Sequence, residues 1–311
     1  MRLAAAGIAL CLALLPRASD AADPQPRDIA IAGSRVFPES LSADSLGTLY
    51  IGSNAGTIYR AMSGDAQAVP WIVPSAANGL QSVFGVMVDE QRHELWVCSD
   101  PRPQTAGKAE LKAFDLGTGE LRATYPFPGD GPALCNDIAI ETGGRVFATD
   151  TLGGRIVSLP PAGTALEAWA SSPDIRGIDG IAIAGDGAMY VNNVQKNWLA
   201  RAERTNAAFT KLTMISTSLP LSGPDGLRPI SGNRLLQAEG PGGRVSVLTI
   251  LGDKAEMLPV ATGIDYPASM VLVGPTVYVP EGKINYLLDP AKRGQDPGTF
   301  RVRAIAMPGF Q

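Results

Sequence analysis

The sequence predicts an all-β protein, a six-bladed β-propeller with four-stranded blades. A turn followed by a short β-type run recurs six times along the 311 residues. The repeat units begin near positions 39, 84, 136, 179, 225 and 268, so successive starts are 43 to 52 residues apart. Four strands per unit at this period are typical of a propeller blade. A β-sandwich, the structural alternative, does not repeat one meander six times.

Each unit contains three clear β-type runs. The innermost runs are residues 39–43, 85–88, 136–140, 179–183, 225–230 and 269–273. The second runs are residues 47–53, 93–99, 144–150, 187–193, 233–239 and 275–281, each with apolar residues at its centre. The third runs are residues 56–60, 109–114, 154–159, 197–201, 243–248 and 282–287. Weaker polar strands, such as residues 121–125 and 209–214, complete most blades.

The two ends of the chain are expected to close the ring. Residues 28–32 and 300–306 both have the composition of strands. Pairing them within the last blade would tie down ends that would otherwise fray. The predicted ring is therefore closed by its N- and C-terminal strands.

The first 21 residues are predicted to be a secretory signal peptide. Met1-Arg2 supplies the positive start, residues 3–15 are an apolar run, and small residues follow at 19–21. That run is too short to cross a bilayer as a helix, so no membrane anchor is expected. Residues 22–311 are then a single propeller domain of an exported protein, either periplasmic or secreted.

The composition limits which classes of binding partner are expected. Charged residues make up 18% of the chain, its net charge is −4, and no basic block occurs, so a nucleic acid partner is not expected. Two cysteines remain after export, Cys98 and Cys135. They lie at the same end of adjacent blades, where they are either a disulfide or two small buried apolar residues. The oligomeric state is not predicted.

The most informative positions are those that open the innermost strands, because these strands line the channel of a propeller. In chain order they are Glu39, Phe84, Asn136, Asp179, Asp225 and Ala268. Four of the six carry side-chain oxygens, and three of these are carboxylates. Asn-Asp and Asp-Gly are also ordinary turn formers. Turn formation does not explain why Glu39, which is in no such pair, shares their register.

Carboxylates brought together in a partly dry channel repel one another unless their pKa values rise or a cation neutralises them. Glu39, Asn136, Asp179 and Asp225 are therefore predicted to bind a divalent metal. Carboxylate and amide oxygens favour calcium first, with magnesium or manganese as alternatives. A histidine zinc site is excluded, because the chain has one histidine, His93, and it lies in a turn.

A second set of polar residues ends the second strand of each blade, beside the start of the innermost strand. Together with Asp137, they are expected to orient the metal ligands or to line the substrate pocket. The candidates are Asp137, Asp150, Asn193, Glu239 and Glu281. Ordinary polar strand ends at the rim are the alternative. Two nearby aromatic residues, Trp198 and Tyr266, are interpreted as packed aromatics rather than as pocket residues.

Four short motifs resemble the regucalcin/gluconolactonase family of calcium-dependent propeller hydrolases, to which paraoxonases and diisopropylfluorophosphatase are related. They are Phe37-Pro38-Glu39-Ser40, Cys135-Asn136-Asp137, Gly177-Ile178-Asp179-Gly180-Ile181 and Pro224-Asp225-Gly226-Leu227. The matching glutamate, asparagine, asparagine and aspartate bind the catalytic metal in that family. The sequence departs from the family pattern at two positions. At the metal site, Asp179 replaces the third family ligand, an asparagine. At a position that bears on the substrate, Leu134 replaces an arginine found in sugar lactonases.

The resemblance implies metal-dependent hydrolysis of a small-molecule lactone or related ester. Asp225 is the first candidate for the base or nucleophile, following the family role of that position, and Asp179 is the second. Two alternatives stay open. One is a non-hydrolytic enzyme like the strictosidine-synthase-like proteins, which share the fold. The other is a non-catalytic propeller that binds a ligand or a partner.

Overall fold

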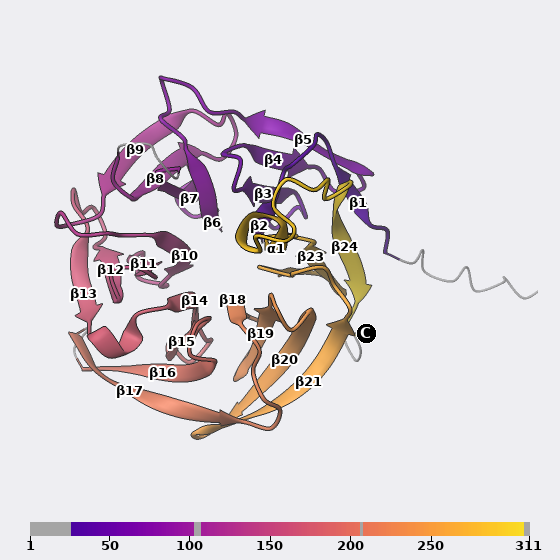
Figure 1. Cartoon of the computed structure of the whole chain (residues 1–311). Helices are drawn as coiled ribbons and strands as arrows, with labels where there is room; N and C mark the ends of the chain where they lie inside the picture. The colour runs from indigo at the N-terminus through magenta and orange to yellow at the C-terminus, as the bar shows by residue number, and fades with distance from the viewer. Residues whose placement is uncertain (1–25, 103–106, 206–207, 308–311) are drawn as a thin grey trace, which may run out of the picture.

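In the part of the chain that the structure describes, 24 strands form six antiparallel meanders around a central channel, which Figure 1 views along its axis. The structure is a computed structural model, and it describes residues 26–102, 107–205 and 208–307. The predicted signal peptide, residues 1–21, lies outside the described residues. The prediction of a six-bladed all-β propeller is confirmed.

The strands of each blade run from the channel outward. Blade 1 contains β2 (Pro38–Ala43), β3 (Leu49–Ser53), β4 (Ile58–Ala61) and β5 (Gln67–Ile72). Blade 2 contains β6 (Ser82–Asp89), β7 (Glu94–Asp100), β8 (Glu110–Asp115) and β9 (Leu121–Pro126). Blade 3 contains β10 (Cys135–Ile140), β11 (Val146–Asp150), β12 (Arg155–Leu159) and β13 (Glu167–Ser171).

The second half of the ring repeats this order. Blade 4 contains β14 (Ile178–Ile183), β15 (Met189–Asn193), β16 (Trp198–Thr205) and β17 (Ala208–Thr217). Blade 5 contains β18 (Pro224–Pro229), β19 (Arg234–Glu239), β20 (Arg244–Leu251) and β21 (Lys254–Thr262). Blade 6 contains β22 (Val271–Val273), β23 (Thr276–Pro280), β24 (Phe300–Ala306) and β1 (Ile29–Ile31).

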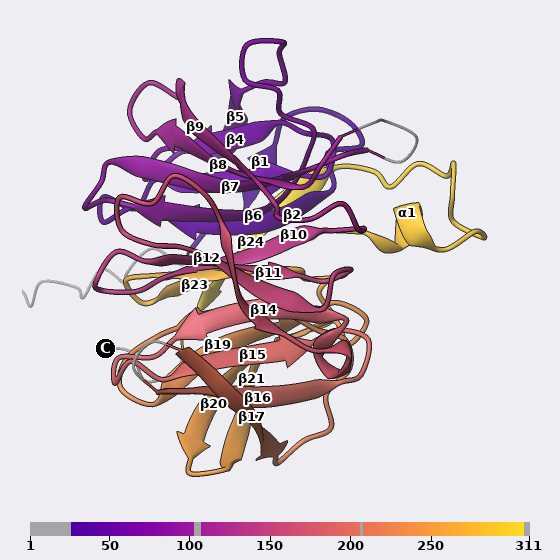
Figure 2. The same cartoon turned by 90° about the vertical axis from the view of Figure 1, so that its left-hand side faces the viewer.

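Blade 6 joins the two ends of the chain. Strand β1 pairs antiparallel with β24, and Ala30 lies opposite Arg301. The predicted closure by the terminal strands is therefore confirmed. The expected strand at residues 282–287 is wrong: the short helix α1 (Asn285–Leu288) occupies the second half of this segment, and the first half is not a strand. Figure 2 shows α1 protruding from one face of the ring. The C-terminal strand takes the third place in the blade, so no room remains there for the segment that carries α1.

The hydrophobic core is divided among the interfaces between blades. Six clusters of buried residues are present in the described part of the chain, one for each pair of neighbouring blades. Between blades 2 and 3, for example, Leu111 packs in one cluster with Ile138 and Val157. Each central strand is thus apolar on both faces, as the sequence pattern indicates.

A disulfide joins blades 2 and 3 at the channel end of the blades. Cys98 in β7 and Cys135 in β10 are bonded, their Cα atoms are 5.1 Å apart, and both side chains are fully buried. The structure thus decides between the two alternatives for these cysteines. Because Cys135 precedes Asn136, the bond also fixes the start of the innermost strand of blade 3.

Replacing both Cys98 and Cys135 by serine is expected to destabilise the protein by about 4 kcal/mol, because the bond closes a loop between residues 37 positions apart. The melting temperature should fall by roughly 10 °C in scanning calorimetry. Thiol titration of the unfolded wild-type protein provides the control and should find no free thiol. An unchanged melting temperature, or two titratable thiols, would contradict the assignment.

Candidate functional site

An irregularity in strand pairing directs the side chains at the channel. In blades 1, 3, 4 and 5 the register between the innermost strand and its neighbour shifts directly after the first paired residue, and in blade 2 it shifts after the second. In blade 4, for instance, Ile178 pairs with Asn193 but the next pair is Ile181 with Val191. The residues between the two pairs, Asp179 and Gly180, leave the regular ladder. Such bulges reorient side chains beside functional sites.

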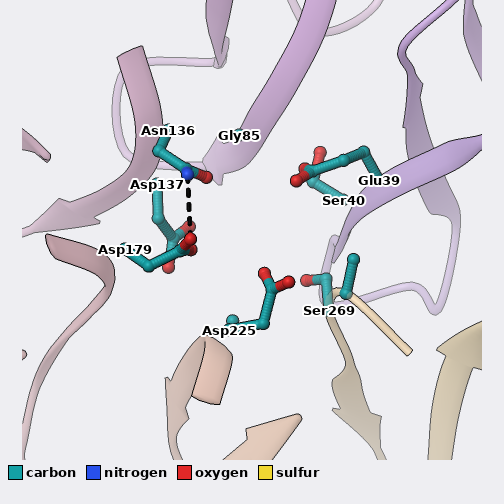
Figure 3. Close-up of a pocket in the computed structure, with 10 residues that line it drawn as sticks. Glu39, Ser40, Gly85, Asn136, Asp137, Asp179, Asp225 and Ser269 are labelled. Carbon is teal, nitrogen blue, oxygen red and sulfur yellow. Dashed lines mark hydrogen bonds between the residues drawn. The ribbon is translucent and has the colours of Figure 1, made fainter. Parts of the chain in front are cut away.

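The bulged residues surround one small cavity on the channel axis. Figure 3 shows Asn136, Asp179, Asp225 and Glu39 arranged around it. The cavity has a volume of about 10 Å³, which is the space of one water-sized sphere. Its lining consists of Glu39, Ser40, Gly85, Asn136, Asp137, Asp179, Asp225, Gly226, Ala268 and Ser269. All four predicted metal ligands therefore line the same cavity.

Blades 1, 3 and 4 each hold the backbone at the channel position of the next blade. The hydroxyl of Thr149 in blade 3 donates to the carbonyl oxygen of Asp179 at 2.6 Å. In the same way, Asn192 Nδ2 in blade 4 donates to the carbonyl oxygen of Asp225 at 2.5 Å. Ser40 in blade 1 donates to the carbonyl oxygen of Phe84. These contacts fix the relative position of the innermost strands, and so of the side chains that they carry.

Gly180 allows the closest of these approaches. A Cβ atom at this position would lie 2.3 Å from the carbonyl oxygen of Asp225, which is a backbone atom and cannot move alone. We expect Gly180→Ala to destabilise the protein by about 2 kcal/mol and to displace Asp225. Thermal unfolding and calcium titration would measure both effects. Gly131→Ala is the control, since a Cβ there meets no atom within 4 Å, and it should change neither property. Equal behaviour of the two variants would contradict this account.

The carboxyl groups of Glu39, Asp179 and Asp225 at the cavity resist ionisation. Burial, and then the charge of Asp137, raises the pKa of Asp179 to about 8. Burial is also the main cause that raises the pKa of Glu39 and of Asp225 well above the ordinary range, and in both groups the charge of Asp179 adds to it. Without a cation, the fold therefore favours protonated carboxyls here.

The polar contacts of Asp179 show which groups still lack partners. Asn136 Nδ2 donates to Asp179 Oδ2 at 3.0 Å, drawn as the dashed line in Figure 3, and, after burial, the charge of Asp179 raises the pKa of the Asp225 carboxyl across the same cavity. Asp179 Oδ1 is buried and has no hydrogen-bond partner among the described residues. An unpaired buried oxygen is costly, and a cation would satisfy it.

The donor set at the cavity fits a hard divalent cation. Three carboxyls and one amide oxygen face a space of single-ion size, without nitrogen or sulfur ligands. In the described part of the chain, no three Asp, Glu, His or Cys side chains already converge in a tight metal cluster. The fit to a cation and the absence of a tight acidic cluster among the described residues agree with each other. One of the four donors is an amide, and Glu39 lies across the cavity from Asp179 in Figure 3.

Asp137 ties three blades together beside the cavity. Its Oδ2 atom accepts hydrogen bonds from Arg228 Nη1 at 2.8 Å and from the backbone N–H of Ile181 at 3.1 Å. Arg228 belongs to blade 5 and Ile181 to blade 4, and the Asp137–Arg228 ion pair is buried. The guanidinium also lowers the pKa of Glu39, although burial outweighs this effect. Arg228 thus places a fixed positive charge close to the site.

The other predicted pocket residues do not line the cavity. Asp150 pairs with Arg155, Glu239 pairs with Arg244, and Glu281 pairs with Arg301 and Arg303. Asn193 caps the turn that follows it by accepting from the backbone N–H groups of residues 195 and 196. These contacts fix the loops that follow the second strands of blades 3 to 6. Their proposed influence on the metal ligands stays a prediction.

The sequence pattern also missed residues at the site. Ser40, Gly85, Gly226 and Ser269 line the cavity, and Arg228 reaches its edge. The first four occupy the position after the channel residue in their blades, so this neighbouring position was a usable signal. Arg228 carried no such signal, because its contact with Asp137 spans 91 residues.

Comparisons with known proteins agree on the fold. No family model and no curated protein sequence matches the chain. A gluconolactonase from Xanthomonas campestris is 14% identical, with a TM-score of 0.63 over 92% of this chain and 99% of that one. The calcium-binding protein regucalcin from Agrobacterium tumefaciens is 16% identical, with a TM-score of 0.62 over 89% and 95% of the two chains.

A virginiamycin B lyase from Staphylococcus aureus is also similar, at 16% identity and a TM-score of 0.59 over 82% of this chain and 81% of that one. At such identities the similarity establishes the fold and leaves the activity open. The chain is therefore a six-bladed β-propeller with the fold of gluconolactonase, regucalcin and related propellers, as the motif resemblance predicts.

Proposed function

We propose that this protein is a divalent-metal-dependent hydrolase of a lactone or related ester. The observation that supports this best is the convergence of Glu39, Asn136, Asp179 and Asp225, from four different blades, on one cavity of single-ion size. Three of these residues are buried carboxyls, an arrangement that is unfavourable without a cation. Structurally similar proteins include a gluconolactonase and a calcium-binding regucalcin.

Glu39, Asn136, Asp179 and Asp225 would hold the cation, and calcium suits these oxygen ligands best, with magnesium or manganese as alternatives. When bound, such a cation supplies Lewis-acid polarisation of a substrate carbonyl and stabilises negative charge on its oxygen. The buried ion pair of Asp137 and Arg228 keeps the surrounding strands in fixed positions. A rigid site of this kind avoids reorganisation during the reaction.

Asp225 is the proposed base, and Asp179 is its alternative. The two carboxyls line the same cavity and, after burial, the charge of Asp179 raises the pKa of Asp225, so one can hold the proton that the other releases. Burial raises the pKa of both groups, which makes either one a stronger base once it is ionised. Asp225 would take a proton from the attacking water or attack the acyl carbon itself.

Export to the periplasm or the medium is part of this proposal. Residues 1–21 have the pattern of a signal peptide. The buried disulfide Cys98–Cys135 is typical of proteins that fold in an oxidising compartment. Among the described residues, no helix has the length and apolar character needed to cross a bilayer.

The test uses the purified protein with a panel of lactones and aryl esters, and calorimetry measures metal binding separately. Hydrolysis should require calcium, fall at least 100-fold in chelator, and return when calcium is added. Calcium binding without hydrolysis of any substrate would favour a ligand-binding propeller. Substrate turnover that persists in chelator and gives a product other than the hydrolysis product would favour a non-hydrolytic enzyme of the strictosidine-synthase-like kind. Either result would overturn the proposed activity.

A further inference from the structure

Four blades enter the channel through the same backbone conformation. The residue two positions before the channel residue has a positive φ in blades 1, 4, 5 and 6: Phe37 (47°), Gly177 (87°), Gly223 (61°) and Tyr266 (57°). Glycine adopts this left-handed conformation without penalty, and blades 4 and 5 have a glycine at this position. A bulky side chain is disfavoured there. Blades 1 and 6 therefore keep an aromatic ring where the fold itself favours glycine.

The ring of Phe37 has a packing role. It is 4% exposed and contacts Phe300 edge-on, with ring centroids 5.2 Å apart, inside the core between blades 6 and 1. Burial of a phenylalanine offsets the strained backbone. Tyr266 has no such explanation, because it is partly exposed and belongs to none of the core clusters of the described residues.

Tyr266 closely precedes, in the chain, the segment of blade 6 that lines the metal-ligand cavity. The backbone around it is fixed, since its carbonyl oxygen accepts from the N–H of Gly282 at 3.1 Å. Its ring lies against Gly240: a Cβ atom there would be 2.6 Å from the ring carbon Cε1. Gly240 in turn donates to the carbonyl of Gly223 at 3.0 Å, two residues before Asp225. On the other side, Tyr266 is followed closely by Ala268 and Ser269, which line the cavity.

The hydroxyl of Tyr266 is an available hydrogen-bond donor. Burial and the charges of Asp225, Asp179 and Glu39 raise the pKa of Tyr266 to about 12, so the hydroxyl keeps its proton at neutral pH. No hydrogen-bond partner for it is present among the described residues. A neutral donor next to a group of carboxyls suits an uncharged oxygen of a ligand, because an anionic ligand would be repelled by the carboxyls.

We propose that Tyr266 contacts the substrate and that its hydroxyl donates a hydrogen bond to an oxygen of an uncharged lactone or ester bound at the cavity. This assignment rests on the hydrolase proposed above. It goes beyond the metal ligands, since it names a specificity-determining residue that holds no metal. It also explains why a tyrosine occupies a position that accepts glycine in blades 4 and 5.

Two substitutions separate the roles of the hydroxyl and the ring. Tyr266→Phe removes only the hydroxyl, and Tyr266→Gly installs the residue that blades 4 and 5 use. Tyr266→Phe should lower kcat/KM 10- to 100-fold, the range for a hydrogen bond to a charged or developing anionic oxygen. Calcium affinity and melting temperature should not change. Tyr266→Gly should lower kcat/KM at least as far and leave the melting temperature equal or higher, because the left-handed strain is removed.

Binding provides a readout that does not depend on turnover. A lactam, the amide analogue of the best lactone substrate, should bind about tenfold more weakly to Tyr266→Phe in calorimetry with calcium present. Tyr125→Phe is the matched control, since Tyr125 lies in β9, the outermost strand of blade 2, and this variant should match the wild type in every assay.

The possible results distinguish this assignment from the proposed function. If the wild type hydrolyses a lactone or ester and Tyr266→Phe retains kcat/KM and lactam affinity within twofold, the assignment is wrong and the hydrolase proposal stands. If Tyr266→Phe lowers calcium affinity or the melting temperature as strongly as activity, the role of the residue is structural and the assignment is wrong. If calcium-loaded wild type hydrolyses no substrate in the panel, both proposals are removed together.

Discussion

Asp225→Asn is expected to lower kcat/KM for the best lactone or ester about 1,000-fold, within the range for loss of a positioned base. The amide keeps an oxygen that can bind a cation, but it cannot accept the proton that the carboxylate would take. Calcium should still bind, although more weakly, because one negative charge is lost. Steady-state kinetics at saturating calcium, with calorimetry to confirm saturation, would separate the loss of the base from the loss of the metal.

The matched substitution is Asp179→Asn. The resemblance places an asparagine at this position in the calcium-dependent hydrolases, so an amide should support the site. We expect a loss of about tenfold or less, smaller than the catalytic contribution of a general base. If Asp179→Asn were the more damaging of the two, the base would be Asp179 rather than Asp225.

An exposed aspartate provides the control for charge alone. Asp253 is 62% exposed and pairs with Arg201 on the outside of the ring. Asp253→Asn removes the same charge and should leave kinetics and calcium affinity unchanged. An Asp225→Asn enzyme within tenfold of the wild type at saturating calcium would remove Asp225 as the base.

Calcium is expected to stabilise the protein more at pH 8 than at pH 5. In the folded protein without metal, the pKa of Asp179 is raised to about 8, and those of Glu39 and Asp225 are raised well above their usual range, mainly by burial. In the unfolded chain the same groups ionise near pH 4. The folded state therefore binds more protons, and the stability that these groups contribute at low pH is lost as the pH rises through about 8.

Calcium reverses this dependence because it binds the ionised carboxylates. At a calcium concentration of about 100 times Kd, the stabilisation is about 2.7 kcal/mol, which corresponds to a rise in melting temperature of roughly 5 to 10 °C. We expect a rise of this size at pH 8 and less than half of it at pH 5. Scanning calorimetry with calcium or chelator at each pH measures the difference.

Matching the ionic strength with sodium chloride controls for general salt effects. The calcium and chelator samples are compared at the same pH. The titration of groups that do not contact the cation therefore contributes equally to both melting temperatures and cancels in their difference. The metal-free protein should also melt at a lower temperature at pH 8 than at pH 5. Equal calcium effects at the two pH values would argue that the carboxyls at the cavity are not the ligands.

Some features of the site followed from local patterns. Each blade repeats a short meander whose strands pair with their neighbours in sequence, so the spacing of the β-type runs was enough to count blades and align their first residues. Glu39, Asn136, Asp179 and Asp225 share that aligned position and line one cavity. The strand at residues 282–287 was predicted wrongly, because its place in blade 6 was taken by the C-terminal strand.

Other features depended on contacts between distant segments. Asp150, Glu239 and Glu281 were expected from the sequence to orient the metal ligands or to line the pocket, yet each is held by an arginine of its own blade and none lines the cavity. Tyr266 was interpreted from the sequence as a packed aromatic. Its ring does lie against Gly240, but it belongs to none of the core clusters of the described residues, and Ala268 and Ser269, which closely follow it, line the cavity.

The amino-acid sequence by itself determined the ring of six blades and the oxygen donors at its channel, since strand propensity and pairing are local properties that repeat with the chain. Only the tertiary structure decided which polar side chains face the cavity. The bulge near the start of the innermost strand in blades 1 to 5 sets these directions, and so does the packing of neighbouring blades, as where Gly180 meets the carbonyl of Asp225. A one-residue change in register reverses the side of a strand on which a residue lies, so its direction is known only once the partner strand is in place.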